Sequence, residues 1–236
     1  MLFEEMTTFE VHKKINERSV AILPIGALEE HGPHLPLATD NIQPEYVAHN
    51  VAELTGAYVL PIIKYGVCSS TKNFPGTITL RFDTLRMLIE DILNELARTG
   101  FKNVVVLSGH AGRVHMTALK LAGQAALEAN PGLKLMILSD YDIAYTMDEI
   151  EIPVNDGHAG MIETSRILAI RPGLVKGTAE PSYPNFPEYR VLRNPEKYFP
   201  SGVMGEPLLA TKEFGENANQ VIVERLVELI EKMVDE

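Results

Sequence analysis

Short runs of consecutive apolar residues alternate along the chain with longer segments in which apolar residues recur every three or four positions. A run that is apolar throughout is typical of a strand with both faces covered, as in a parallel sheet. The clearest example is apolar from Val104 to Leu107. The predicted strands are residues 19–25, 57–63, 103–108 and 133–138.

Segments with helical spacing lie between and after these runs. In residues 83–98 the apolar side chains share one face, Asp83 suits an N-cap, and Gly100 follows the end. Thr8 is expected to cap the first helix, and Pro44 to stand at an early position of the second. The predicted helices are residues 9–17, 44–55, 83–98, 114–129, 161–169 and 215–235.

The order of these elements predicts the fold class. Strands that alternate with helices form a mostly parallel sheet with helices on both faces, which is an α/β fold. The 236 residues fit one large domain of this class, or two small ones. Residues 171–211 are rich in proline, glycine and tyrosine, and we expect them to cross the surface as an ordered excursion.

Composition and net charge mainly exclude certain partners, a disulfide and membrane-spanning or signal segments. The net charge of −11 argues against nucleic acid or an anionic membrane surface as a partner, and we expect a small-molecule substrate instead. Cys68 is the only cysteine, which rules out an internal disulfide and fits a reducing compartment. The sequence has no run of about 18 apolar residues and no signal-peptide pattern at its start, so we expect a cytoplasmic protein.

The candidate chemistry begins directly after the first predicted strand. The loop there carries Glu29, Glu30, His31, His34 and Asp40 among glycines and prolines, which fix a loop and hold its side chains. Carboxylate oxygen and imidazole nitrogen are ligands that zinc, manganese and iron accept. This loop is therefore a candidate metal site.

Further candidate ligands follow other elements. His110 comes after the third predicted strand, and His158 and Glu163 lie near the start of a predicted helix. Because ligands bind beyond the carboxyl ends of parallel strands, these side chains and the first loop could meet at one rim of the sheet. Clustered histidines and carboxylates at such a rim favour a metal site.

Each of these residues also has a plainer explanation when taken alone. A loop histidine beside glycine usually makes a local hydrogen bond, and Glu29 and Glu30 alone would be solvated surface charges. Asp40 could cap the following helix. His34 also fits a structural role between two prolines, and His115 fits packing on a helix.

Five motifs resemble the signatures of the creatininase family. They are residues 24–40, 74–77 (Phe-Pro-Gly-Thr), 108–112 (Ser-Gly-His-Ala-Gly), 157–165 (with Gly-His-Ala-Gly and Glu-Thr-Ser) and 202–215. The resemblance spans most of the chain. It implies a three-layer αβα sandwich, a single domain over residues 1–236, and hydrolysis of a C–N bond in a small cyclic or formylated substrate at a dinuclear metal site.

The resemblance also implies roles for individual residues. Asp40 would bridge two divalent ions, which would be zinc, manganese or iron. Creatininase itself has a further glutamate ligand two positions after the histidine of its second signature, where this chain has Gly112. Either Glu163 supplies the missing carboxylate, or the second ion is held more weakly. The other implied metal ligands are Glu29, His31 and His110.

His158 is our candidate for the catalytic general acid–base. It is a histidine beside two glycines in a loop separate from the other candidate ligands. Imidazole exchanges a proton near neutral pH, and a departing nitrogen needs one.

Substrate choice is predicted from the stretch before Phe-Pro-Gly-Thr, where many family members carry Glu-His. This chain has hydroxyls and a lysine there, which suit a polar or phosphorylated substrate, or a solvated turn. The variant resembles the archaeal branch that deformylates a formamidopyrimidine ribonucleotide in flavin (riboflavin) and deazaflavin biosynthesis, and we expect that deformylase reaction ahead of creatinine hydrolysis. The expected substrate-binding residues are Ser70, Thr71, Lys72, Phe74 and Gly109.

Other functions stay open. Creatinine or another cyclic amide could be the substrate, and the peptide-trimming and inosose-hydrolysing branches of the family also fit. In a different class, the chain could be a metal-binding scaffold that has lost activity, with Gly112 as the first sign. The family implies a homo-oligomer, a hexamer, for which the aromatic residues of 171–211 could supply an interface.

Overall fold

A four-stranded parallel sheet organises the computed structural model, which describes residues 1–146 and 151–236. The strand order is β2-β1-β3-β4. The two central strands, β1 and β3, are buried at every position, which explains their unbroken apolar runs. The strands are β1 (Val20–Ile25), β2 (Tyr58–Val59), β3 (Asn103–Ser108) and β4 (Lys134–Ser139).

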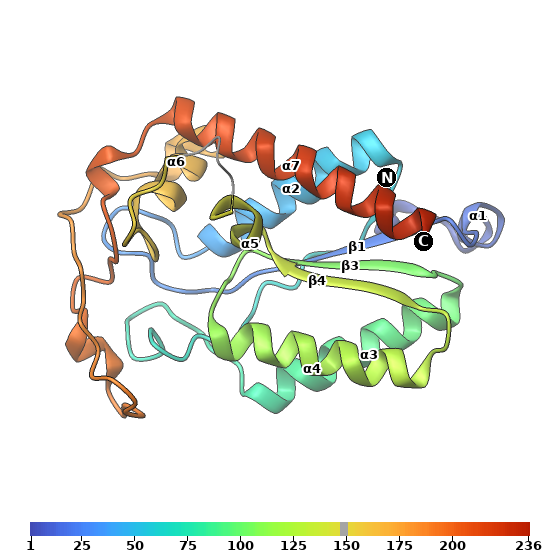
Figure 1. Cartoon of the computed structure of the whole chain (residues 1–236), viewed down its shortest axis with the longest axis horizontal. Coiled ribbons are helices and arrows are strands. Elements are labelled where there is room, and N and C mark those ends of the chain that lie inside the picture. Colours follow the sequence, from blue (N-terminus) through green and yellow to red (C-terminus); the bar gives the residue numbers. More distant parts are fainter. Residues whose placement is uncertain (147–150) are drawn as a thin grey trace.

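Helices cover both faces of this sheet and make three layers (Figure 1). Helices α2 (Thr39–Thr55) and α7 (Lys212–Asp235) pack on one face, and α3 (Phe82–Thr99) and α4 (Arg113–Ala129) pack on the other. Alternate side chains of β3 serve the two cores, as the pleat of a strand requires: Val105 and Leu107 in one, Val104 and Val106 in the other. The predicted α/β sandwich is confirmed.

The remaining helices are short or peripheral. Most lie in the first residues or near the carboxyl ends of the strands (Figure 1). The α-helices are α1 (Thr8–Lys14), α5 (Asp140–Ala144) and α6 (Met161–Ile170), and the 3₁₀ helices are Phe3–Glu5, Pro172–Leu174, Pro195–Tyr198 and Pro207–Leu209. Within the described ranges, no helix has both the length and the apolar character needed to cross a bilayer.

Several predicted boundaries were wrong. Thr7, not Thr8, caps α1, which ends at Lys14 rather than at residue 17. Helix α3 begins at Phe82, so Asp83 lies in its first turn, where its charge favours the helix dipole, and does not cap it. Helix α7 begins at Lys212 behind its cap Thr211, earlier than predicted.

Two other differences have clear physical causes. The predicted strand 57–63 shortens to Tyr58–Val59, because Pro61 cannot donate to a ladder and only an isolated bridge at Ile63 follows. Helix α2 begins at Thr39, five residues before the predicted start, so that Pro44 lies inside it. The earlier start places Asp40 in the first turn of the helix. Helix α5, which follows β4 directly, was not predicted.

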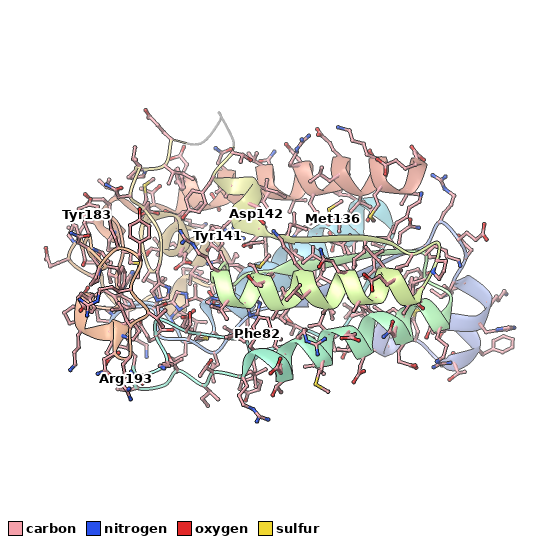
Figure 2. All side chains as sticks on the ribbon, turned by 60° about the horizontal axis from the view of Figure 1, so that its bottom comes forward. Phe82, Met136, Tyr141, Asp142, Tyr183 and Arg193 are labelled. Atoms are coloured by element: carbon pink, nitrogen blue, oxygen red, sulfur yellow. The ribbon has the colours of Figure 1, made fainter. Side chains whose placement is uncertain are left out.

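The carboxyl ends of the parallel strands meet at one end of the molecule. The long segment 171–211 lies at the same end, opposite the N-terminal helix α1 (Figure 1). Figure 2 shows Tyr183 and Arg193 of that segment there, beyond Tyr141 at the start of α5. The chemistry-bearing loops are therefore gathered at one rim.

Candidate metal centre

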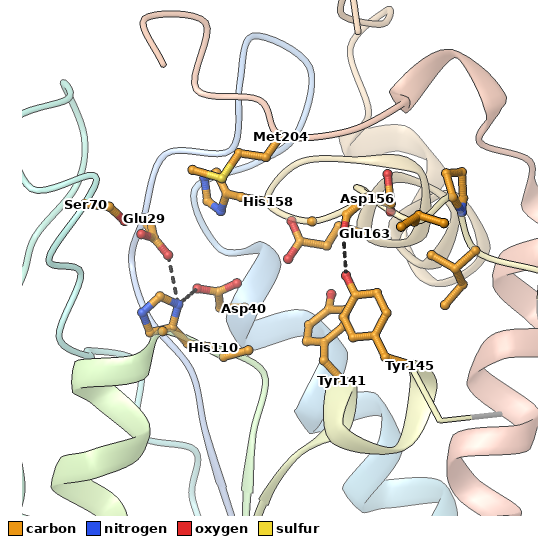
Figure 3. Close-up of a pocket in the computed structure, with 16 residues that line it drawn as sticks. Glu29, Asp40, Ser70, His110, Tyr141, Tyr145, Asp156, His158, Glu163 and Met204 are labelled. Atoms are coloured by element: carbon orange, nitrogen blue, oxygen red, sulfur yellow. Dashed lines mark hydrogen bonds and ion pairs between the residues drawn. The ribbon is translucent and has the colours of Figure 1, made fainter. Parts of the chain in front are cut away.

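Four elements bring the candidate ligands to this rim. Glu29 and His31 come from the loop after β1, Asp40 from the first turn of α2, His110 from the loop after β3, and Glu163 from the first turn of α6. All five side chains are buried. Residues more than 130 positions apart in sequence therefore form one cluster, and Figure 3 shows all of its members except His31.

The packing at the start of α2 requires glycine at two positions. A Cβ at Gly26 or at Gly109 would lie 2.2 Å from the backbone oxygen of Asp40. Only glycine permits this approach, because that contact is far inside van der Waals distance. The ends of β1 and β3 can thus press against the turn of α2 that carries Asp40.

The ligand atoms form two overlapping groups around Asp40. Nδ1 of His110 lies 2.9 Å from Oε2 of Glu29 and 3.0 Å from Oδ2 of Asp40. On the other side, Nε2 of His31 lies 3.0 Å from Oδ1 of Asp40 and 3.5 Å from Oε2 of Glu163. Asp40 therefore offers one oxygen to each group, which is the arrangement that a bridging carboxylate needs.

Hydrogen bonds fix which nitrogen of each histidine faces the cluster. Nδ1 of His31 lies 3.1 Å from the backbone oxygen of Glu29, and Nε2 of His110 lies 3.1 Å from the backbone oxygen of Val67. A carbonyl only accepts, so these two nitrogens carry protons. The opposite nitrogens are then free to bind a metal, as in many protein metal sites.

A direct test of fit is whether the ligand atoms have other partners. Across the described residues, Oε2 of Glu29, Nε2 of His31 and Oδ2 of Asp40 are buried and make no hydrogen bond of good geometry, and their ion-pair contacts, at 2.9–3.5 Å, are with other members of the cluster. Buried polar atoms without partners are costly, and a divalent cation at each group would satisfy them. The side chains present therefore fit two divalent ions, and oxygen with nitrogen ligands suits zinc, manganese or iron.

The structure also accounts for Gly112. A Cβ there would lie 2.5 Å from Nε2 of His110, so a side chain at this position would displace the histidine. Glu163 instead brings its carboxylate to His31 and Asp40 from another element. Its position is set by the N–H of Ala159, which donates to Oε2 over 2.6 Å from a left-handed backbone conformation (φ 53°).

His158 lies at the edge of this cluster with Glu30 as its partner. Nε2 of His158 is 3.2 Å from Oε1 of Glu30, and its ring centroid is 4.3 Å from that of His31. Taken alone, Glu30 was interpreted as a solvated surface charge, and this was wrong. Glu30 is buried, and its Oε2 accepts the N–H of Gly32. The signal that identifies Glu30 is a contact across 128 positions, which no local pattern contains.

Two of the predicted substrate-binding residues lie beside the cluster, but in different ways. Ser70 borders a pocket that opens onto the cluster (Figure 3). Thr71 is buried and donates its hydroxyl to Oε1 of Glu29, so it holds a candidate ligand.

The other three predicted substrate-binding residues lie outside the lining of this pocket. Lys72 is exposed, and Phe74 packs edge-on against Phe199 with ring centroids 5.4 Å apart. Gly109 provides the close approach to Asp40 described above. Their contact with substrate therefore stays a prediction without structural support.

Two further buried histidines take supporting positions. Nε2 of His34 is 2.8 Å from the hydroxyl of Thr164, and burial together with nearby His31 lowers the pKa of His34 to about 4, so it is neutral at pH 7. Nδ1 of His115 accepts the N–H of Val67, whose carbonyl in turn fixes His110. His115 thus supports a ligand through a peptide unit.

A pocket of about 710 Å³ opens onto the cluster (Figure 3). Glu29, Asp40, His110 and Glu163 form its floor, and His158 and Met204 border it. Among the described residues that line it, none is lysine or arginine. Its far side is formed by Tyr141, Tyr145, Ile152, Pro153, Val154 and Asp156.

The charges of the cluster are set by mutual contact. Burial disfavours the charged form of His31, but Asp40 and Glu163 outweigh it and raise the pKa of His31 to about 10. In the same way, Glu29 and Asp40 outweigh burial and raise the pKa of His110 well above its usual value. Both shifts favour the protonated imidazole in the metal-free protein.

Metal binding at pH 7 should consequently release at least two protons per chain, one from each imidazole. Because protons compete with the metal, affinity should weaken as the pH falls. Calorimetric titration of the metal-free protein with zinc, in two buffers of different ionisation enthalpy, measures this release. Binding without proton release would show that neither His31 nor His110 is a ligand.

Comparison with known proteins agrees with the motifs. The model of the creatininase family, described as creatinine amidohydrolase, matches residues 4–230. The chain is 32% identical to the creatinine amidohydrolase of Pseudomonas putida, over 89% of this chain and 88% of that protein. It is 30% identical to the mycofactocin precursor peptide peptidase of Mycolicibacterium smegmatis, over 89% and 82% of the two chains. A 3-dehydro-scyllo-inosose hydrolase of Thermotoga maritima is 24% identical, over 98% and 82%.

Solved structures show the same likeness. A creatininase variant complexed with creatine superposes with a TM-score of 0.88 at 30% identity, covering 99% of this chain and 98% of the other. A structure described as manganese creatininase superposes with a TM-score of 0.86 at 29% identity, covering 98% and 97%. Another variant, with a TM-score of 0.88 at 29% identity over 98% and 97% of the chains, is described as a zinc–zinc form.

Proposed function

The chain belongs to the creatininase family, and from this premise we propose that it is a metal-dependent amidohydrolase that cleaves a C–N bond, other than a peptide bond, in a small polar substrate. The observation that carries the proposal is the buried cluster of five ligands, in which the ring nitrogens of His31 and His110 face carboxylate oxygens at 2.9–3.5 Å. Such a cluster at the floor of an open pocket supports catalysis more than stability.

Each of the two candidate metal positions has its own ligands and shares one carboxylate with the other. Glu29 and His110 would hold one ion, His31 and Glu163 the other, and Asp40 would bridge them. When bound, divalent ions supply Lewis acidity, which polarises a carbonyl and lowers the pKa of water towards neutrality. Zinc, manganese and iron all accept these ligands.

His158 would move the proton in the reaction. Glu30 can accept the Nε2 proton of His158 and so orient the ring, which leaves Nδ1 to exchange a proton with the substrate. When the C–N bond breaks, the departing nitrogen needs a proton, and His158 lines the pocket where that nitrogen would lie. Glu30 is then a positioning residue for His158.

For the substrate, we favour a cyclic amide such as creatinine over the formamidopyrimidine ribonucleotide. The described lining of the pocket holds carboxylates, histidines, tyrosines and apolar side chains but no lysine or arginine, the cationic side chains that commonly pair with a phosphate group. Lys72, the cation that suggested a phosphorylated substrate, is exposed and outside this lining. Deformylation is the second candidate, favoured by the absence of Glu-His before Phe74.

A panel assay tests this proposal. The zinc-, manganese- and iron-loaded protein is incubated with creatinine, other cyclic amides, N-formylated pyrimidines with and without a ribose phosphate, and short peptides. We expect release of the ring-opened product from a cyclic amide, and loss of turnover after removal of the metal with a chelator. Turnover of only the phosphorylated formamide would select the deformylase reaction instead.

The same assay separates an enzyme from an inactive scaffold. A protein with both metal positions filled but with no turnover on any compound would favour the scaffold. A protein that binds none of the three metals would refute the metal centre itself.

We also propose that the chain forms a homo-oligomer, a hexamer, as its family resemblance implies. Segment 171–211 exposes Tyr183, Tyr189 and Val191 next to the pocket end of the molecule, and aromatic side chains are enriched at interfaces. Size-exclusion chromatography with light scattering measures the mass directly, and a 26.1 kDa particle would contradict the proposal.

A further inference from the structure

The single cysteine lies against one of the two candidate metal positions. Cys68 follows β2 in the chain, is fully buried, and has its backbone N–H fixed by the hydroxyl of Thr79 at 2.9 Å. Its Sγ, a carboxylate oxygen of Glu29 and a ring nitrogen of His110 all lie within 4.8 Å of one another. Zinc binds sulfur at about 2.3 Å and nitrogen or oxygen at about 2.0–2.2 Å, so two atoms on one ion lie at most about 4.5 Å apart, and small side-chain movements would bring these three atoms to one ion.

A second observation points to a ligand at the same place. Oε2 of Glu29 is buried, lies 2.9 Å from Nδ1 of His110, and has no oriented hydrogen-bond partner among the described residues. The other oxygen of Glu29 is occupied by Thr71, so Oε2 is the atom left to bind a cation. The sulfur, the carboxylate and the imidazole therefore come close together from three different loops.

We propose that Cys68 is a thiolate ligand of the ion held by Glu29 and His110, and that it makes this position selective for zinc over manganese. The inference rests on the metal centre proposed above and adds a ligand that none of the signature motifs contains. On binding, the S–H bond breaks, a bond from sulfur to the ion forms, and the proton passes to solvent. No oxidation or reduction accompanies the step.

The selectivity follows from the softness of sulfur. Thiolate favours zinc, whereas carboxylate and water suit manganese. The second position, built from His31, Asp40 and Glu163, contains no sulfur. The two positions should therefore differ in metal preference, although they share Asp40.

Cobalt(II) is the probe that reports a sulfur ligand without any activity measurement. The metal-free full-length protein is titrated with cobalt(II) chloride, and absorption is recorded for the wild type, Cys68→Ser and the control Ser69→Ala, an exposed neighbour. Serine has nearly the volume of cysteine, and thermal unfolding checks that each variant folds. We expect a thiolate-to-cobalt charge-transfer band in the wild type and in Ser69→Ala that is lost in Cys68→Ser, while the visible ligand-field bands remain.

The outcomes separate this inference from the metal centre. Ligand-field bands without a charge-transfer band in the wild type would overturn the role of Cys68 and leave the metal centre standing, whereas no cobalt binding at all would overturn both. Competition between zinc and manganese gives a second readout. We expect Cys68→Ser to lower the preference for zinc at one of two positions by at least roughly 10- to 100-fold, since removing even a contact outside the ligand set costs that much metal affinity. An unchanged preference would contradict the proposed selectivity.

Discussion

Replacing His158 by alanine is expected to lower kcat about 100- to 10,000-fold, the usual contribution of a general acid–base, while both metal positions stay filled. His158 contacts Glu30 rather than a bridging carboxylate, and it is only partly buried at the edge of the cluster. Its loss should therefore remove proton transfer and spare the metal ligands. The measurement is kcat on the best substrate of the panel, together with metal content by elemental analysis.

Because Nε2 of His158 lies beside Glu30, a variant of Glu30 tests separately how the ring is positioned. Glu30→Gln keeps a hydrogen-bond acceptor beside His158 but removes the charge, so kcat should fall less than in His158→Ala. Ser69→Ala, which alters an exposed side chain near the pocket, should leave kcat unchanged. A loss of metal in His158→Ala would show instead that His158 is a ligand, for which its grouping with Glu29 and His31 within 4.8 Å leaves room.

The fold was predictable where burial on both faces restricts a segment to apolar residues. Strands β1 and β3 are covered on both faces, so almost every residue must be apolar, and an unbroken apolar run follows. Strand β2 was overestimated for the same reason, because residues 57–63 are apolar whether or not they pair, and Pro61 ends the ladder. The start of α2 was hidden because Pro44, a typical first-turn residue, lies inside the helix.

The candidate site was predictable only as far as its residues share a loop or a motif. Glu29, His31 and Asp40 lie in one short segment after strand β1, so their common location follows from the sequence. The contacts that orient them arise between distant segments. Thr71 reaches Glu29 across 42 positions, and no periodicity or spacing encodes such a pair.

Replacing Asp40 by asparagine is expected to impair both metal positions at once. Its two oxygens face the two groups separately, Oδ1 towards His31 at 3.0 Å and Oδ2 towards His110 at 3.0 Å. Asparagine keeps the size of the side chain but removes the negative charge and turns one oxygen into a nitrogen that donates. Affinity for both ions should fall by more than about 100-fold, beyond the loss typical of outer contacts, and turnover should disappear.

A variant that should affect only one metal position tests whether Asp40 bridges both. Glu29→Gln should weaken one ion and spare the other, whereas Glu53→Gln, on an exposed part of the same helix as Asp40, should weaken neither. Thermal unfolding adds a measurement that needs no substrate. Zinc at 100 times its dissociation constant stabilises a protein by about 2.7 kcal/mol for each site that it fills, so the wild type should gain about this much from each position and Asp40→Asn almost nothing. If Asp40→Asn kept one ion at wild-type affinity, Asp40 would belong to a single position, and the two groups around it would be independent sites.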